Sequence, residues 1–87
     1  MLIMDIITWG PDQAQAVMKH RGEEKIPEGI KLLGQWVDIA GGRAFRLAEV
    51  PDPKLLFAMT SFWIGFGKKE LVSVMPTEEM MKLIPRK

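Results

Sequence analysis

The pattern of apolar and polar positions predicts a small domain that mixes strands with amphipathic helices. Two strand-like runs flank Gly41-Gly42, and a two-residue glycine loop is typical of a β-hairpin because both positions accept a positive φ. An apolar, isoleucine-rich run opens the chain, as expected of a buried strand. In chain order the pattern predicts a strand over 2–9, a helix over 11–22, strands over 30–39 and 43–50, a helix over 52–65, a strand over 69–75 and a short helix from residue 76.

The Gly41-Gly42 loop also predicts which hairpin residues oppose each other. It pairs Ala40 with Arg43, and therefore Trp36 with Leu47. Val37 then opposes Arg46, and Asp38 opposes Phe45. Because side chains alternate between the faces of a sheet, one face is expected to carry Ile30, Leu32, Trp36, Phe45 and Leu47. The other is expected to carry Lys31, Leu33, Gln35, Val37, Ala44, Arg46 and Ala48.

Both long helices show an apolar stripe at helical spacing. The first carries Ala14, Val17, Met18 and Arg21 at i, i+3, i+4 and i+7. The second begins with Asp52 as the N-cap and Pro53 in the first turn. Its wide apolar face consists of Leu55, Leu56, Met59, Phe62, Trp63 and Phe66, while Phe57 and Ile64 lie on the opposite side.

These elements predict one domain over residues 1–87, an α+β ferredoxin-like βαββαβ sandwich with a short C-terminal helix. The expected sheet is four-stranded and antiparallel, in the order 4-1-3-2, with helices on one face. Both faces of the central strands carry apolar side chains, so a second copy of the sheet is expected to cover the other face. Either the Trp36 and Phe45 face or the Arg46 face could form this homodimer.

Composition narrows the class of protein. The chain has 87 residues, 47% of them hydrophobic, and a net charge of +1 without a basic stripe, which argues against a nucleic-acid binder. The first strand is too short to span a membrane and lacks the features of a signal peptide. Cysteine is absent, which fits a reducing cytoplasm and excludes thiolate chemistry. No motif for a nucleotide, metal or other cofactor is present.

Candidate chemistry rests on a few side chains. Asp5 and Arg46 fall mid-strand on the two central strands, here taken to run parallel. They are interpreted as a buried salt bridge in preference to a charge pair lining a ligand cavity. The aromatic residues Trp36, Phe45 and Trp63 predict either a ligand pocket between sheet and helices or simply core. The single histidine is interpreted as a surface or half-buried residue, and without cysteine it gives no basis for a zinc site.

Several short segments carry a resemblance to a known family. They are Pro27-Glu28-Gly29-Ile30, Trp36-Val37, Gly42-Arg43-Ala44-Phe45-x-Leu47-x-Glu49, Asp52-Pro53-x-Leu55-Leu56 and Trp63. Together they look like a widespread family of short prokaryotic proteins of unknown function. That family resembles the dimeric α+β barrel superfamily, whose members include cofactor-free monooxygenases, haem-degrading enzymes and lactone isomerases. The resemblance implies the fold and a dimer, and it brings no established activity.

Two functions are compatible with the sequence. The first is a small cytoplasmic homodimer that binds a small apolar ligand or another partner, with Trp36, Phe45, Trp63, Arg43 and Arg46 as ligand-binding candidates. The second is a cofactor-free monooxygenase- or isomerase-like enzyme acting on an apolar oxygenated molecule. In that case Arg43 or Arg46 stabilises an anionic intermediate, and His20 is the base. Independently of function, Arg43 is expected to anchor the hairpin by stacking on Trp36 or Phe45 or by pairing with Asp38.

Overall fold

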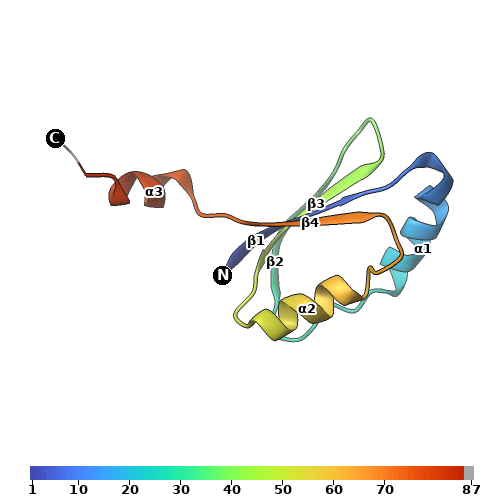
Figure 1. Ribbon diagram of the computed structural model, residues 1–87, viewed down its shortest axis with the longest axis horizontal. Helices are drawn as coiled ribbons and strands as arrows, with labels where there is room; N and C mark the ends of the chain where they lie inside the picture. Colours follow the sequence, from blue (N-terminus) through green and yellow to red (C-terminus); the bar gives the residue numbers. More distant parts are fainter. Residues whose placement is uncertain (86–87) are drawn as a thin grey trace.

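The computed structural model describes residues 1–85 and confirms the predicted α+β fold (Figure 1). Four strands, two long helices and a terminal helix follow each other in βαββαβ order, with a 3₁₀ turn before the first helix. The elements are β1 (Leu2–Thr8), the 3₁₀ turn (Pro11–Gln13), α1 (Ala14–Glu23), β2 (Lys31–Val37), β3 (Arg43–Glu49), α2 (Pro53–Ser61), β4 (Lys68–Ser73) and α3 (Thr77–Leu83).

The strands form one antiparallel sheet in the order β2-β3-β1-β4, as predicted. The central strands β1 and β3 also run antiparallel, so the expectation of a parallel central pair was wrong. The physical reason is the connection: the crossover through α1 returns β2 in the direction of β1, and the tight hairpin then reverses β3 between them. Asp5 and Arg46 still lie directly opposite each other on these strands.

The register of the hairpin differs from the prediction by two residues. Trp36 pairs with Phe45 and Val37 with Ala44, and the Asp38 amide donates to the Arg43 carbonyl at 2.9 Å. The loop therefore comprises residues 39–42. Its start is set by the Asp38 carboxylate, which accepts a 3.0 Å hydrogen bond from the amide two residues on. Gly41 and Gly42 follow with φ of 90° and 84°.

A bulge between Leu32 and Gly34 changes which residues of β2 lie on each face of the sheet, compared with the prediction. A shift of two residues keeps every side chain on its face, so Trp36 still shares a face with Phe45 and Leu47. The extra residue of the bulge changes the alternation beyond it. Leu32 consequently lies opposite Ala48, on the other face from Trp36, and the predicted grouping of the two was wrong.

The two faces of the sheet have different environments. Helices α1 and α2 lie together on one side (Figure 1). That side, the covered face, buries Ile3, Asp5, Ile7, Ala44, Arg46 and Ala48. Its core is completed by Val17 of α1, Met59 of α2 and Trp63 in the turn that follows α2. The opposite side, the open face, carries Met4, Ile6, Trp36, Phe45, Leu47 and Val72.

Helix α2 begins as predicted and ends early. The Asp52 carboxylate accepts a 2.8 Å hydrogen bond from the Lys54 amide, and Pro53 occupies the first turn. The helix stops at Ser61, four residues before the predicted end at Gly65. Gly65 and Gly67 take positive φ values of 88° and 67°, which turn the chain back toward β4. Phe57 and Ile64 are exposed, as expected.

The chain beyond β4 leaves the rest of the molecule. Figure 1 shows α3 at the end of an extended segment that points away from the sheet. The radius of gyration is 15.0 Å, and the longest extent is 53 Å. A compact domain of this length has a radius of gyration of about 12 Å. Within residues 1–85, no helix has both the length and the apolar character needed to cross a membrane.

Candidate functional site

A buried salt bridge lies at the centre of the covered face. Nη2 and Nε of Arg46 on β3 donate to Oδ2 of Asp5 on β1, at 2.8 Å and 3.1 Å. The two side chains are 9% and 2% exposed. The strands set this geometry, because the two residues are register partners whose side chains point to the same side. The predicted buried pair is confirmed.

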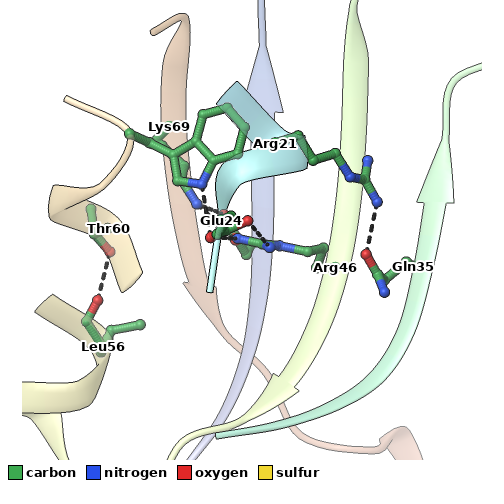
Figure 2. Close-up of polar contacts among 9 residues, drawn as sticks. Arg21, Glu24, Gln35, Arg46, Leu56, Thr60 and Lys69 are labelled. Carbon is green, nitrogen blue, oxygen red and sulfur yellow. Dashed lines mark hydrogen bonds and ion pairs between the residues drawn. The ribbon is translucent and has the colours of Figure 1, made fainter. Parts of the chain in front are cut away.

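Two further charged residues, Glu24 and Lys69, extend this pair into a four-residue group, the charge cluster: Asp5, Glu24, Arg46 and Lys69. Figure 2 labels Glu24, Arg46 and Lys69. Arg46 Nη1 donates to Glu24 Oε1 at 2.7 Å, and Lys69 Nζ donates to both Asp5 oxygens at 2.7 and 2.8 Å. Two cations thus meet two carboxylates. Because buried charges are tolerated only when they are paired and hydrogen-bonded, this balance is what allows the cluster to exist under the helices.

The cluster is assembled from four separate segments. Lys69 reaches it because β4 pairs with β1 in a register that places it beside Ile7. Glu24 follows α1 directly, with an extended backbone that turns its side chain toward Arg46. Its Oε2 also accepts a 3.0 Å hydrogen bond from Nε1 of Trp63. The group therefore ties both helices to the sheet.

The cluster shifts the pKa values of its two cations in opposite directions. Burial lowers the pKa of Lys69 below its ordinary value of 10.5, and the hydrogen bonds and attraction of Asp5 offset this only in part. Burial also opposes the charge of Arg46. There, the hydrogen bond to Glu24 and the attraction of Asp5 prevail and raise its pKa above the ordinary value for arginine. Arg46 is thus a fixed positive charge, and Lys69 is the more readily deprotonated cation.

A small chamber lies between the cluster and α1, with a volume of about 20 Å³. A cavity needs about 10–15 Å³ to hold one water molecule, so the chamber in this conformation fits a single water. Three cations and one carboxylate are among its lining residues, together with an apolar wall. The lining consists of Asp5, Ile7, Trp9, Val17, Met18, Arg21, Ala44, Arg46, Trp63 and Lys69.

A wider groove adjoins the chamber at the β2–β3 turn. It is lined by the segment 9–11, by Ala14 and Met18 of α1, and by residues 40–42. Trp9 and Met18 line both spaces, so they separate the groove from the chamber. Met18 is 47% exposed. An exposed methionine changes rotamer readily because it has three flexible bonds, so its movement is the simplest way to join the two spaces.

Of the three cations that line the chamber, Arg21 is the one contributed by α1. Its Nη2 donates to the side-chain oxygen of Gln35 at 2.7 Å (Figure 2). Among residues 1–85, no carboxylate lies within salt-bridge distance of its guanidinium. Arg21 therefore presents a charge that the fold itself leaves uncompensated by direct pairing.

The predicted site residues separate onto the two faces of the sheet. Arg46 and Trp63 line the chamber. Trp36, Phe45 and Arg43 lie on the open face, and Trp36 is 54% exposed. A single pocket lined by Trp36, Phe45 and Trp63 is therefore not formed, because Trp36 and Phe45 point to the other side of the sheet from the helices.

Arg43 occupies the anchoring position that the sequence predicts. Its guanidinium donates to Oδ2 of Asp38 from Nε and Nη2, each at 3.3 Å. The same guanidinium lies 5.4 Å from the centroid of the Phe45 ring. Both contacts hold the end of the hairpin on the open face, away from the chamber.

His20 lies in an aromatic stack at the ends of the two helices. Its ring is parallel to those of Phe62 and Phe66, with centroids 3.9 and 3.7 Å away. Its Nε2 contacts the Phe62 carbonyl oxygen. The half-buried interpretation of His20 is confirmed. In the described part of the chain, no group of three or more histidine or acidic side chains is arranged to hold a metal ion.

Sequence reasoning missed Glu24, Lys69 and Arg21 as members of the site. Glu24 belongs to the polar run Glu23-Glu24-Lys25, which looks like a solvated loop. Lys69 stands between Lys68 and Glu70, and only the pairing with β1 decides which of the three points inward. For Arg21, a signal existed: the residue ends the apolar stripe of α1 and so was bound to face the sheet.

The fold and the site together define a small α+β protein with ferredoxin-like topology and a charge cluster beneath its helices. The chain belongs to a family described as domain of unknown function DUF3303, whose profile matches residues 1–87. Searches of curated proteins and of solved structures found no match to this chain.

Proposed function

We propose that this protein is a homodimeric module that binds a small apolar molecule carrying a carboxylate or similar oxygen-bearing group. The observation that carries the proposal is the chamber, which combines an apolar wall with an excess of cations. Small-molecule sites in proteins are mostly apolar and contain a few convergent polar groups. Arg21 is suited to bind the anionic group because no carboxylate neutralises it directly within residues 1–85.

Binding of anything larger than water requires the chamber to open. The proposed route is displacement of Met18, which separates the chamber from the groove beside it. The apolar body of the ligand would then lie against Trp63 and Trp9. The carboxylate would lie near Arg21, with Arg46 and Lys69 as the cations behind it.

Thermal unfolding with matched ligands tests this site. Benzoate and short fatty acids are expected to raise the melting temperature with concentration, whereas benzamide and the corresponding alcohols are not. Met18→Ala should strengthen the effect by opening the chamber, and Arg21→Gln should remove it. Lys19→Gln, an exposed change on the same helix, is the control. No shift with any carboxylate in the wild type and Met18→Ala would refute the ligand site.

The homodimer is supported by the open face. Its apolar side chains lie opposite the helices and, within residues 1–85, no element covers them (Figure 1). Two such faces packed together would bury them, as in a dimeric α+β barrel. Trp36, Phe45 and Arg43, predicted as ligand-binding residues, would then belong to the interface. The sequence did not decide which face of the sheet meets the partner. We propose the face that carries Trp36 and Phe45.

Light scattering at micromolar concentration tests the dimer. The wild type is expected to have twice the mass of one chain. Ile6→Lys places a charge at the centre of the open face and should give a monomer, because an unpaired buried charge is costly. Ala16→Lys on the exposed side of α1 is the control. A wild-type protein that is monomeric throughout this range would refute the dimer.

A cofactor-free enzyme acting on an apolar oxygenated molecule is a second candidate, favoured by Lys69. Lys69 lines the chamber, and burial lowers its pKa, so its ammonium gives up a proton more readily than that of an exposed lysine and the resulting amine could act as a base. Arg46 would stabilise the anion formed. His20, the base expected from the sequence, is instead stacked on Phe62 and Phe66.

Turnover without added cofactor tests the second candidate. Suitable assays are isomerisation of unsaturated lactones and oxygen uptake with hydroxylated aromatics. An enzyme should lose its activity in Lys69→Met and keep it in Lys68→Met, whose side chain is exposed. Activity that survives Lys69→Met would refute Lys69 as the base. Ligand binding without turnover would leave the binding module as the function.

A further inference from the structure

Polar side chains form a line across the covered face of the sheet, named here the cross-strand row: Asp5, Arg46 and Gln35. Asp5 on β1 is the register partner of Arg46 on β3, and Arg46 is the register partner of Gln35 on β2. Register partners point to the same side of a sheet. Neighbouring strands lie about 4.8 Å apart, so the two ends of the row, at Asp5 and Gln35, are about 10 Å apart.

Each end of the cross-strand row holds a cation. Lys69 Nζ donates to both oxygens of Asp5, at 2.7 and 2.8 Å. Arg21 Nη2 donates to the side-chain oxygen of Gln35 at 2.7 Å. Figure 2 shows Lys69 and Arg21 on opposite sides of Arg46. Because both cations also line the chamber, the length of the row sets the distance between them there.

The lining between the two cations is apolar. Ile7 and Ala44 are register partners on β1 and β3, and both are buried. They line the chamber together with the buried side chains of Val17 and Trp63. A ligand that reaches from one cation to the other therefore needs an apolar body with a polar group at each end.

The two cations differ in chemistry. The guanidinium of Arg21 is a planar fork that matches a carboxylate and keeps its charge. Lys69 carries a primary amine, which becomes a nucleophile when its ammonium loses a proton. Burial lowers the pKa of Lys69, and repulsion from Arg46 acts in the same direction. Desolvated lysines beside another cation are known to form imines with carbonyl compounds.

We propose that Lys69 forms a covalent imine with an aldehyde or ketone group of a small apolar acid whose carboxylate binds Arg21. The inference rests on the proposed ligand site and narrows its ligand to an oxo acid with the two groups at opposite ends. The hydrogen bond from Arg21 to the carboxylate takes up about 3 Å of the row and the new bond to Nζ about 1 Å, so the two ends of the ligand are expected on the order of 6 Å apart. One benzene ring with para substituents has this size.

The reaction balances in atoms and charge. The ammonium of Lys69 loses one proton to the adjoining Asp5, and the amine adds to the carbonyl carbon while the carbonyl oxygen takes up that proton. The resulting carbinolamine expels its oxygen as water, which carries away two of the three hydrogens that Nζ held. The nitrogen keeps one hydrogen and a positive charge in the iminium. Asp5 therefore still faces a cation, and the charge cluster keeps two cations and two carboxylates.

Reductive trapping tests the imine in the full chain. The protein is incubated with 4-formylbenzoate and sodium cyanoborohydride, which reduces an iminium to a stable secondary amine. Mass spectrometry then locates the adduct in the sequence. We expect one adduct per chain, on Lys69, and little on the exposed Lys68 beside it. Because access depends on Met18, the same trapping in Met18→Ala should proceed faster.

Matched probes and variants separate the roles of the two cations. 4-Formylbenzamide has the same aldehyde without the negative charge and should label Lys69 about tenfold less, as expected for loss of one charged hydrogen bond. Arg21→Gln should lower labelling by 4-formylbenzoate to the same level. Lys69→Arg keeps a cation beside Asp5 and should give no adduct at this position. Lys68→Met should be labelled as the wild type is.

The outcomes distinguish the imine from the ligand site on which it rests. Labelling spread evenly over the lysines, or no adduct on Lys69 in either the wild type or Met18→Ala, refutes the imine. If benzoate still raises the melting temperature in that case, the ligand site stands and the imine alone is refuted. Equal labelling of Lys69 by the benzoate and benzamide probes refutes the role of Arg21 in placing the oxo acid.

Discussion

Glu24 and Trp63 are joined by a hydrogen bond of 3.0 Å between Oε2 and the indole Nε1, although 39 positions separate them in the chain. The contact links the end of α1 to the segment that follows α2. The same carboxylate accepts two hydrogen bonds from Arg46 beneath it. Glu24 therefore fastens both helix ends to the centre of the sheet, and its loss would leave two buried donors without a partner.

Replacing Glu24 by leucine should be among the most destabilising single changes in the described chain. Arg46 and Lys69 would retain Asp5 as their single carboxylate, and breaking a buried ion pair typically costs about 3–5 kcal/mol. Glu24→Gln should cost less, because it keeps an acceptor for Trp63 and removes only the charge. Urea unfolding followed by tryptophan fluorescence measures both changes.

Glu23 provides the matched control for this prediction. It is the neighbouring residue, has the same charge and is exposed. Glu23→Leu and Glu23→Gln should change the free energy of unfolding by no more than about 0.5 kcal/mol, as surface substitutions usually do. Equal effects at positions 23 and 24 would mean that the charge cluster contributes nothing specific to stability.

Arg43 should act as an anchor of the hairpin turn. Its guanidinium contacts both Asp38 and the Phe45 ring. Exposed cation–π and ion-pair contacts each contribute up to about 1 kcal/mol. Arg43→Ala is expected to lower the free energy of unfolding by about 1 kcal/mol, and Lys25→Ala, an exposed change in a loop, by less. A denaturation curve of Arg43→Ala that overlays that of the wild type would show that Arg43 is only a solvated charge.

The order of the elements could be predicted because its signals are local. Alternation, the Asp52-Pro53 helix start and the glycines at the turns each act within a few residues. The end of α2 was missed because Phe62 and Trp63 continue an apolar helical pattern, while the positive φ of Gly65 depends on the return to β4. The hairpin register failed for a similar reason, since the Asp38 carboxylate starts the turn before the glycines.

The site was predictable only where the sheet pattern determined it. Asp5 and Arg46 are charged residues in the middle of largely apolar strand segments, an unusual position that indicates a buried ion pair. Glu24 and Lys69 occur among other charged residues, where no period distinguishes an inward side chain from an outward one. Their roles follow from the end of α1 and from the pairing of β4 with β1, both of which are long-range outcomes of folding.

Gly67 and Gly65 form a matched pair for testing the turn before β4. Both have positive φ, so an alanine at either position is strained by about 1–2 kcal/mol. A Cβ at Gly67 would also lie 2.6 Å from the Thr8 carbonyl oxygen, whereas one at Gly65 meets open space. Gly67→Ala should therefore be clearly more destabilising than Gly65→Ala in urea unfolding. Equal effects of the two substitutions would mean that the β1 backbone at Thr8 moves aside without loss of stability.

Because of Lys69, the free energy of unfolding should increase as the pH rises into the alkaline range. Its pKa in the folded state is lowered by burial, whereas in the unfolded state it has the ordinary value of 10.5. Between these two pKa values the unfolded chain binds more protons than the folded one at this site. The free energy of unfolding contributed by Lys69 therefore increases with pH across that window and levels off above 10.5.

Urea unfolding at a series of alkaline pH values up to 10.5 measures this dependence. The chain contains neither tyrosine nor cysteine, so no phenol or thiol titrates in the same window. The charged groups that face Lys69 are Asp5, Glu24 and Arg46. Lys69→Met should abolish the rise, whereas Lys68→Met, an exposed change one residue away, should retain it. An unfolding free energy that still rises with pH in Lys69→Met, or that falls with pH in the wild type, would show that burial does not lower the pKa of Lys69.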